Sequence, residues 1–190
     1  MIDPDAELVR QAGAGDARAA ETLVRRHLPK MVGLARRMLS DATEAEDIAQ
    51  EVFLRVWREA PHWRPGHAKF ETWMHRVALN LCYDRLRRRR EQLDADAGVY
   101  VADTRPLASE EWLARQRAAK VHAALAALPE RQRAAIALVH FDETSNIAAA
   151  EILEISVEAL ESLLARGRRA LKAALADVAG DLIDGAEGAP

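Results

Sequence analysis

The sequence contains one cysteine among 190 residues, Cys82, and this scarcity excludes an internal disulfide framework. A chain without disulfides fits a reducing compartment. The N-terminus, MIDPDAELVR, lacks the basic-then-apolar order of a signal peptide, and no apolar run approaches the ~20 residues that a membrane span needs. We therefore expect a cytoplasmic protein that does not itself insert into a membrane, with Cys82 as a small apolar core residue.

Motifs for metal-dependent or nucleotide-driven chemistry are also missing. Neither a G-x-x-x-x-G-K-[ST] phosphate loop nor an H-E-x-x-H pair occurs. His62, His67, His75, His122 and His140 show no spacing typical of a metal site. We expect no metal and no cofactor, and we interpret these histidines as surface or packing residues.

Strand signals are scarce, because few apolar runs alternate, whereas Ala, Leu, Glu and Arg recur at helical spacing. The sequence predicts an all-α protein with two small helical domains. The first domain spans residues 1–91, and a flexible acidic linker, residues 92–109, joins it to a helix-turn-helix domain at 110–176. Residues 177–190 form an acidic tail that we expect to be disordered.

Charge is distributed unevenly along a chain whose formal net charge is only −3. Residues 64–90 hold eight Arg and Lys residues against Glu71 and Asp84, whereas no basic residue follows Lys172. Such segregation indicates a protein that binds a polyanion with one surface and something else with another.

A short helix at 5–14 and two longer helices are predicted ahead of this basic segment. Asp16 caps a helix that runs through Leu39, and Pro29 is expected to kink or break it. The next helix opens at Ser40 or Asp41, with Glu44 three residues after Asp41 as a capping-box partner.

The second of these helices carries an acidic side around an apolar residue. This side holds Asp47, Gln50, Glu51, Leu54 and Arg58. A single exposed leucine is common on protein surfaces, so the pattern by itself fits either an ordinary solvated face or a protein-docking face.

The basic segment begins with the loop at 61–68, PHWRPGHA, whose Pro and Gly residues prevent regular helix. Trp63 and Arg64 offer stacking and charge there. The following helix, 69–90, is predicted to bury one side and to expose a neighbouring stripe. The expected core side is Phe70, Met74, Val77 and Leu81, and the stripe is Trp73, Arg76, Asn80 and Arg87.

This loop and helix together indicate a platform for single-stranded nucleic acid. Aromatic rings stack on bases of any sequence, and Asn hydrogen-bonds base edges. Taken alone, the helix fits better an amphipathic helix with a solvated basic end, so the rest of the chain has to decide between the two interpretations.

The second domain contains a predicted helix-turn-helix. The first helix spans 146–153, Ser156 is a natural N-cap for the second, and Ala149 is small where the two helices cross. Any two short amphipathic helices with a Ser between them give a similar pattern.

Five segments in order resemble the extracytoplasmic-function (ECF) class of bacterial sigma factors, from Asp5 to about Ala176. They are EAEDIAQEVFLRVWR, the Pro/Gly loop, FETWMHRVALNLCYDRLRRRR, an acidic linker, and LAALPERQRAAIALVHF with its helix-turn-helix. The resemblance implies a non-enzymatic initiation factor that binds core RNA polymerase, recognises promoter DNA, helps to open it, and is controlled by an anti-sigma factor.

The resemblance also implies roles for matching residues. The residues that match the family's polymerase-binding positions are Asp47, Gln50, Glu51 and Leu54. The residues that match its minus-ten DNA-binding positions are Trp63, Arg64, Trp73, Arg76, Asn80, Arg85, Arg87 and Arg88. Arg76 and the arginines from Arg85 to Arg90 would hold phosphates. Minus-thirty-five DNA binding falls on Ser156, Glu158, Ser162, Arg166, Arg168 and Arg169.

The second domain departs from the family where many members have Gly in the turn and a basic residue early in the recognition helix. This chain has Glu154 in the turn, and Glu158, Glu161 and Leu163 at the expected base-facing positions. Glu accepts a hydrogen bond from cytosine but repels phosphates.

Two other function classes stay open at this point. An ordinary helix-turn-helix regulator would use the second domain alone and leave the acidic helix, the Trp-containing loop and the basic helix unexplained. A helical adaptor that binds only protein would fit the acidic faces and the negative net charge.

Overall fold

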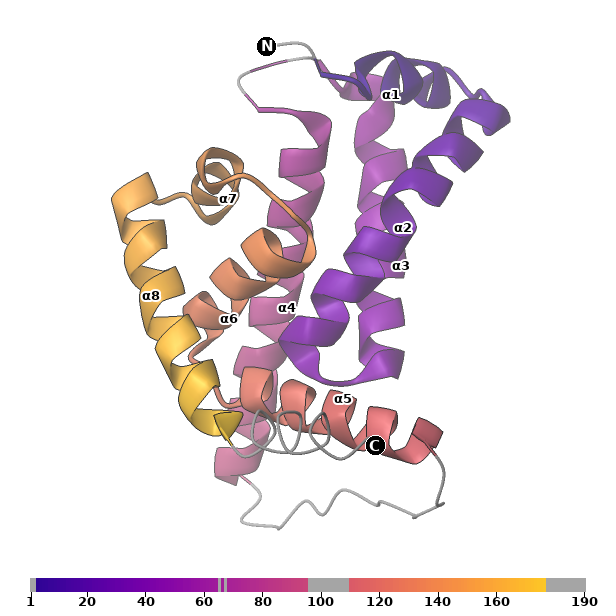
Figure 1. Cartoon of the computed structure of the whole chain (residues 1–190). Coiled ribbons are helices and arrows are strands. Elements are labelled where there is room, and N and C mark those ends of the chain that lie inside the picture. Colours follow the sequence, from indigo (N-terminus) through magenta and orange to yellow (C-terminus); the bar gives the residue numbers. More distant parts are fainter. Residues whose placement is uncertain (1–2, 65, 67, 96–109, 177–190) are drawn as a thin grey trace, which may run out of the picture.

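The computed structural model describes residues 3–64, 66, 68–95 and 110–176, and it confirms the all-α prediction over these residues, which contain no strand (Figure 1). The first domain contains α1 (Ala6–Gly13), α2 (Ala17–Leu39), α3 (Ala42–Glu59), the 3-10 turn η1 (Ala60–His62) and α4 (Phe70–Ala95). The second contains α5 (Glu110–Ala126), α6 (Glu130–Ile136), the π-helical η2 (Ala137–Phe141), α7 (Asn146–Leu153) and α8 (Val157–Ala174).

Helix starts follow the predicted caps. The Asp16 carboxylate accepts hydrogen bonds from the backbone N–H groups of Arg18 and Ala19, and the Asp41 carboxylate accepts one from Glu44. Each cap satisfies backbone donors that have no partner inside the helix. The Glu44 carboxylate itself contacts Arg89 of α4, so it also joins two helices.

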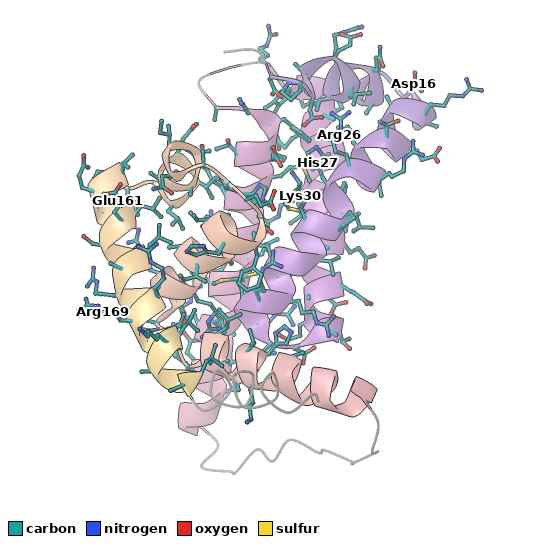
Figure 2. All side chains as sticks on the ribbon, in the orientation of Figure 1. Asp16, Arg26, His27, Lys30, Glu161 and Arg169 are labelled. Carbon is teal, nitrogen blue, oxygen red and sulfur yellow. The ribbon has the colours of Figure 1, made fainter. Side chains whose placement is uncertain are left out.

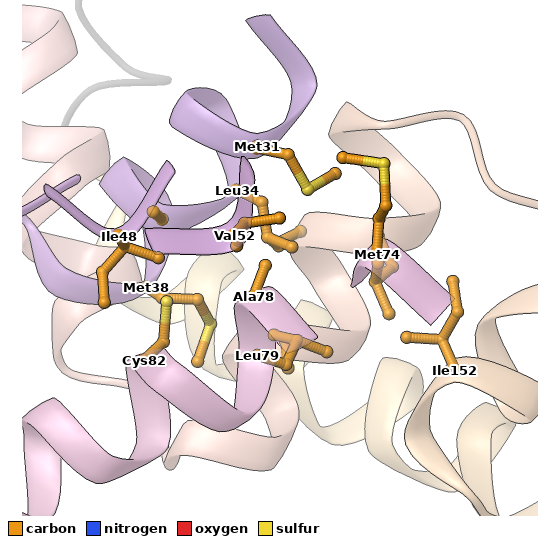
Figure 3. Packing of buried hydrophobic residues seen from close by; sticks show 14 of the residues in the cluster. Met31, Leu34, Met38, Ile48, Val52, Met74, Ala78, Leu79, Cys82 and Ile152 are labelled. Carbon is orange, nitrogen blue, oxygen red and sulfur yellow. The ribbon is translucent and has the colours of Figure 1, made fainter. Parts of the chain in front are cut away.

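The core of the first domain lies where α2, α3 and α4 meet (Figure 3). Met31, Leu34 and Met38 of α2 pack with Ile48 and Val52 of α3 against α4. Burial of this apolar surface is the main stabilising contribution, at about 25 cal/mol per Å².

Cys82 lies in this core, as predicted, with no exposed surface. Burial raises the pKa of its thiol to about 12. A thiol that stays protonated at neutral pH is a poor nucleophile, so Cys82 acts as a packing residue.

Two predictions about α2 and α4 hold only in part. Pro29 does not break α2, which is continuous through it. In α4 the buried side includes Ala78, Leu79 and Cys82, whereas Val77 and Leu81 are only partly buried. Periodicity of large apolar residues misplaced this side because small residues fill the close contact between helices.

The linker boundary also differs from the prediction. Helix α4 continues to Ala95, past the predicted start of the linker at residue 92, and α5 begins at Glu110 as expected. The rest of the predicted linker and the tail from residue 177 lie outside the described residues.

The second domain has the predicted helix-turn-helix with the predicted bounds. Ser156 caps α8 by accepting a hydrogen bond from Ala159, and Ala149, Leu160 and Leu164 are buried. Leu138 is fully buried there, and Val139 is partly buried against the core. The π-helical turn η2 shifts the side-chain register relative to an α-helix.

The two domains pack together, and their buried apolar residues form a continuous core. Helix α7 contacts α4, and α5 and α6 contact α2 (Figure 1). Helix α8 lies on the outer side of the second domain.

Candidate nucleic-acid interface

The predicted stacking residues form an aromatic cluster at the start of α4. The rings of Trp63 and Phe70 lie 5.2 Å apart between centroids, those of Trp63 and Trp73 5.4 Å, and those of Phe70 and Trp73 5.7 Å. Phe70 is buried, while both tryptophans are half-buried, and Arg64 in the adjoining loop is exposed. Partly exposed rings on a buried Phe form a rigid surface on which bases can stack.

Arg76 and Asn80 follow one and two turns later on α4. Asn80 is exposed and lines a cavity of about 350 Å³ between the domains. Arg76 donates hydrogen bonds from Nη2 (2.7 Å) and Nε (3.2 Å) to the backbone oxygen of Glu151 in α7. The predicted stripe therefore exists as a surface, and α7 contacts it.

The basic end of α4 divides into two groups. Arg87 and Arg88 are exposed, and Arg87 pairs with Asp84 at 3.0 Å, while Arg85 lies 3.6 Å from Glu44. Weak surface pairs of this kind are easily exchanged for phosphates.

Arg89 and Arg90 differ, because their partners lie on other helices. Arg89 donates to the Leu39 backbone oxygen at the end of α2, and Arg90 pairs with Glu130 at 3.1 Å. The phosphate-holding role that the resemblance implies for Arg89 and Arg90 stays a prediction.

The acidic side of α3 faces solvent as predicted. Asp47 and Gln50 are exposed, Glu51 is half-exposed and pairs with Arg55, and Leu54 exposes 49% of its surface.

Beside this side lies an apolar groove of about 510 Å³ between α2 and α3, which the sequence did not predict. Leu28, which is 37% exposed, and Val24 both line the groove. The docking groove is defined by Val24, Leu28, Val32, Glu46, Gln50, Phe53, Leu54 and Trp57. Exposed apolar surface with a carboxylate rim is typical of a protein-binding site.

The helix-turn-helix presents α8 to solvent (Figure 2). All the residues predicted to contact minus-thirty-five DNA are exposed: Ser156, Glu158, Ser162, Arg166, Arg168 and Arg169. Leu163 is an exception to the expected base-facing set, because it is half-buried against the core.

Two acidic residues shape the start of α8. Glu154 occupies the turn with φ 54° and ψ 47°, the left-handed conformation that Gly adopts more easily. Hydrogen bonds from its own backbone N–H and from Ser156 lower the pKa of Glu158, so this side chain is an anion at neutral pH.

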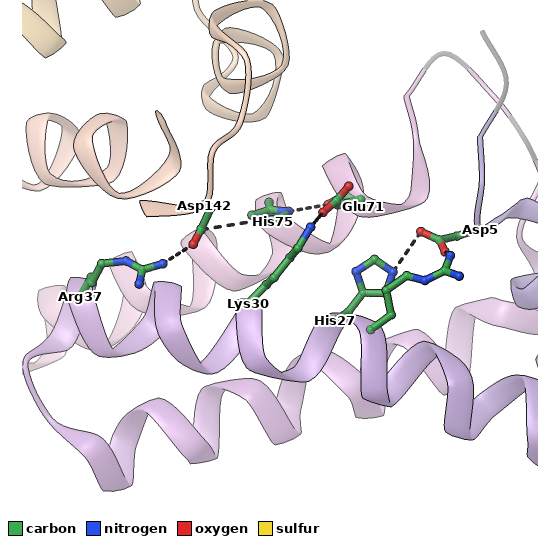
Figure 4. Close-up of polar contacts among 8 residues, drawn as sticks. Asp5, His27, Lys30, Arg37, Glu71, His75 and Asp142 are labelled. Carbon is green, nitrogen blue, oxygen red and sulfur yellow. Dashed lines mark hydrogen bonds and ion pairs between the residues drawn. The ribbon is translucent and has the colours of Figure 1, made fainter. Parts of the chain in front are cut away.

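A partly buried polar cluster that the sequence did not reveal runs along α2 (Figure 4). Arg37 pairs with Asp142, His75 donates from Nδ1 to the Glu71 backbone oxygen at 2.8 Å, and Lys30 pairs with Glu71. Burial raises the pKa of Asp142, although the nearby charge of Arg37 acts to lower it. Burial lowers the pKa of His75.

None of the described helices is long and apolar enough to cross a membrane. The described residues also contain no group of three or more His, Cys, Asp and Glu side chains placed to hold a metal ion.

A helix-turn-helix beside a helical domain with a basic, aromatic face is typical of a DNA-binding protein. Sigma-70 region 2 matches residues 23–92, and Sigma-70 region 4 matches residues 118–171. The chain belongs to the sigma-70 family and, within it, to the ECF class of RNA polymerase sigma factors.

Individual relatives support this assignment. The chain is 33% identical over 181 residues to the ECF RNA polymerase sigma factor SigW of Bacillus subtilis, covering 90% of this chain and 96% of SigW. It is 32% identical over 183 residues to the RNA polymerase sigma-H factor of Pseudomonas aeruginosa, covering 91% of this chain and 94% of that factor. The structure of CnrH in complex with the cytosolic domain of CnrY aligns with a TM-score of 0.71 at 28% identity, covering 92% of this chain and 99% of CnrH.

Proposed function

We propose that this sigma factor divides promoter initiation among three surfaces. The α3 side and its docking groove bind core RNA polymerase, the α4 stripe captures the minus-ten element, and α8 reads the minus-thirty-five element. The observation that supports this division of roles is that the acidic side of α3 and the α4 stripe are separate surfaces. Polymerase and DNA can therefore be bound at the same time. Residues 1–91 with the helical extension to Ala95 form the first functional unit, and residues 110–176 form the second.

Docking rests on Leu54 as an apolar anchor with Asp47, Gln50 and Glu51 around it. Interface energy is concentrated in a few buried apolar or aromatic side chains surrounded by polar groups. The half-exposed Leu54 beside Trp57 and Phe53 fits the anchor role, and the carboxylates favour a basic partner surface.

Promoter DNA is proposed to be opened by the capture of unpaired bases on the α4 stripe. Separating duplex DNA costs about 1.4 kcal/mol per base-pair step, and stacking a base on an aromatic ring contributes about 1–3 kcal/mol. Trp63 and Trp73 supply the stacking surface, Asn80 supplies base-edge hydrogen bonds, and Arg64, Arg76, Arg85, Arg87 and Arg88 bind phosphates. A few captured bases therefore offset the opening of a few base pairs, without a covalent or nucleotide-driven step.

Minus-thirty-five binding is assigned to Ser156, Glu158, Ser162, Arg166, Arg168 and Arg169. The arginines lie farther along α8 than the acidic start, so phosphates are bound near its C-terminal half. The anionic Glu158 suits a cytosine amino group.

Control by an anti-sigma factor is part of the proposal. The structurally similar CnrH binds the cytosolic domain of CnrY. The apolar docking groove of this chain offers a surface where such a partner would exclude polymerase. Both events take place in the cytoplasm.

The test is transcription from an unmelted promoter. Candidate promoters are found by mapping transcription starts after forced expression, and purified protein is then added to core polymerase on these templates. We expect a stable complex with polymerase and initiation that requires the added protein. Tight duplex binding without polymerase binding would contradict the proposal and identify a helix-turn-helix regulator, whereas polymerase binding without initiation would identify an adaptor.

A further inference from the structure

The aromatic cluster of Trp63, Phe70 and Trp73 is supported by the first residues of the chain. Helix α1 lies beside the end of α3 (Figure 1) and packs against η1. Its Val9 is fully buried in the core. The segment 60–70, which carries Trp63 from η1 to α4, therefore begins against α1.

The start of α4 is held by a residue from the N-terminus. The backbone N–H of Phe70, the first residue of α4, has no partner inside the helix. Lys69, which precedes the helix, has no side-chain acceptor and cannot cap it. The Asp3 carboxylate takes this role, because its Oδ2 accepts a hydrogen bond from the Phe70 N–H at 2.8 Å. A carboxylate is favourable at the positive end of the helix dipole.

Asp3 is itself held in place. Its Oδ1 accepts a hydrogen bond from the backbone N–H of Asp5 at 3.0 Å, and Asp5 is fixed to α2 by Arg26 and His27. The His27 ring in turn meets the Phe70 ring edge to face, with 6.0 Å between centroids. A cap and a ring contact thus join the N-terminal segment and α2 to the first residue of α4.

Gly13, at the end of α1, allows a close approach to the other end of the segment. A Cβ atom at this position would lie 2.5 Å from the Ala60 backbone oxygen and 2.8 Å from the Pro61 nitrogen. Such contacts overlap, so a side chain here would push the backbone at 60–61 away from α1. Gly33 in α2 differs, because a Cβ there would meet the flexible end of the Arg37 side chain at 3.2 Å.

We propose that Asp3 and Gly13 are positioning residues for minus-ten capture, because they fix the two ends of the segment that carries Trp63. The inference rests on the proposed role of the α4 stripe. Trp63 packs against Phe70 and Trp73, so a shift of either end of the segment changes how the three rings are arranged. Rings that are already in place lose less conformational freedom when a base stacks on them, and this increases the affinity for the base.

The cap is tested with variants of Asp3 in the full chain. Asp3→Ala removes the acceptor, whereas Asp3→Asn keeps a side-chain oxygen, and Asn caps helices about as well as Asp. Asp41→Ala is the matched control, since it removes the aspartate cap of α3 at the opposite end of that helix from η1.

Three quantities are measured for each variant. Thermal unfolding gives the stability, and hydrogen exchange in the free protein gives the protection of the Phe70 amide. Permanganate reactivity of unpaired thymines at saturating core polymerase gives the open fraction of a mapped promoter.

We expect Asp3→Ala to speed exchange of the Phe70 amide and to lower the open fraction about fivefold, the change in an equilibrium constant that one lost helix cap gives. Asp3→Asn should restore both quantities to the wild-type level. Asp41→Ala should lower the stability to a similar degree and leave both quantities unchanged.

Gly13→Ala and Gly33→Ala form a second matched pair, for the other end of the segment. Gly13→Ala should lower the open fraction, because its Cβ displaces the backbone of Ala60. Gly33→Ala should leave the open fraction at the wild-type level.

Unchanged exchange of the Phe70 amide in Asp3→Ala would overturn the cap. Faster exchange with a normal open fraction, or an equal loss of opening in Asp3→Asn and Asp41→Ala, would overturn the positioning role. Failure of the proposed function looks different, because Trp73→Ala in the otherwise wild-type chain would then leave the open fraction unchanged, and the positioning role would fall with it.

Discussion

Asp5 is a buried acid that joins the first turn of the chain to α2. It exposes 2% of its surface, pairs with Arg26, and lies 2.9 Å from His27 Nε2 (Figure 4). Burial opposes ionisation of Asp5, but the hydrogen bonds and charges of His27 and Arg26 outweigh it and lower its pKa. An acid with a lowered pKa stabilises the fold above its unfolded-state pKa, and this stabilisation is lost as pH falls through the folded-state value.

We therefore expect Asp5→Asn to destabilise the protein by about 2 kcal/mol at pH 7, because a charged hydrogen-bond partner of His27 and Arg26 is lost. Urea denaturation at a series of pH values measures the effect. The difference in the free energy of unfolding between the variant and the wild type should stay constant from pH 7 to about pH 5 and shrink at lower pH. A difference that grows on acidification would contradict this assignment.

Glu154 has a backbone conformation that costs free energy, with φ 54° at the end of α7. Glycine adopts this conformation without strain, so Glu154→Gly should stabilise the protein by about 0.5 kcal/mol, as measured by thermal unfolding. Glu154→Ala is the matched control, since it removes the carboxylate near Arg76 but keeps the strain. Equal stability of the two variants would show that the charge, and not the backbone, matters.

Several individual residues could not be predicted from the sequence. The partners of Arg133 and Arg76 are backbone oxygens, which every residue possesses, so no sequence pattern marks them. His27 was not singled out because its acceptor, Asp5, lies on another helix. Glu154, in contrast, was predictable, because the spacing of the two helices demands a tight turn there.

Helix α3 was predictable at both ends and on both sides. Its Asp41 cap, buried Ile48 and Val52, and exposed Leu54 follow from capping chemistry and a 3.6-residue period. In α4 the same method misplaced Val77 and Leu81, because that helix is covered on two sides, by α2 and α3 and by α7. The docking groove is formed between two helices, α2 and α3, so the residue pattern of either helix alone does not predict it.

The α3 side leads to a prediction for polymerase binding. Leu54→Asp should weaken binding to core polymerase by about tenfold or more, because an apolar anchor is replaced by a charge. Ile147→Asp is the matched control, since Ile147 is another large apolar residue with 73% exposure, located on α7 away from the groove. Competition binding with labelled wild-type protein measures both affinities, and an equal loss in the two variants would contradict the docking assignment.

The compact packing of both domains is the feature of the whole molecule that sequence reasoning could least foresee. A sequence that predicts two domains and a flexible linker does not indicate which surfaces of the two domains pack against each other. The contacts that join them combine Arg side chains with helix C-termini and buried apolar residues from distant segments. The two family regions are therefore independent in sequence but form one structural unit here.

The division of roles between the two faces of the first domain is the central claim, and permanganate footprinting on an unmelted promoter tests it most directly. Permanganate detects unpaired thymines, so it reports opening separately from polymerase affinity. Asn80→Ala should lower the open fraction about tenfold and leave polymerase affinity unchanged, because the proposal assigns hydrogen bonding of base edges to Asn80. Asp47→Arg with Leu54→Ala should lower polymerase affinity, with opening recovered at saturating polymerase. Normal opening with Asn80→Ala, or an equal loss of polymerase affinity in both variants, would contradict the account.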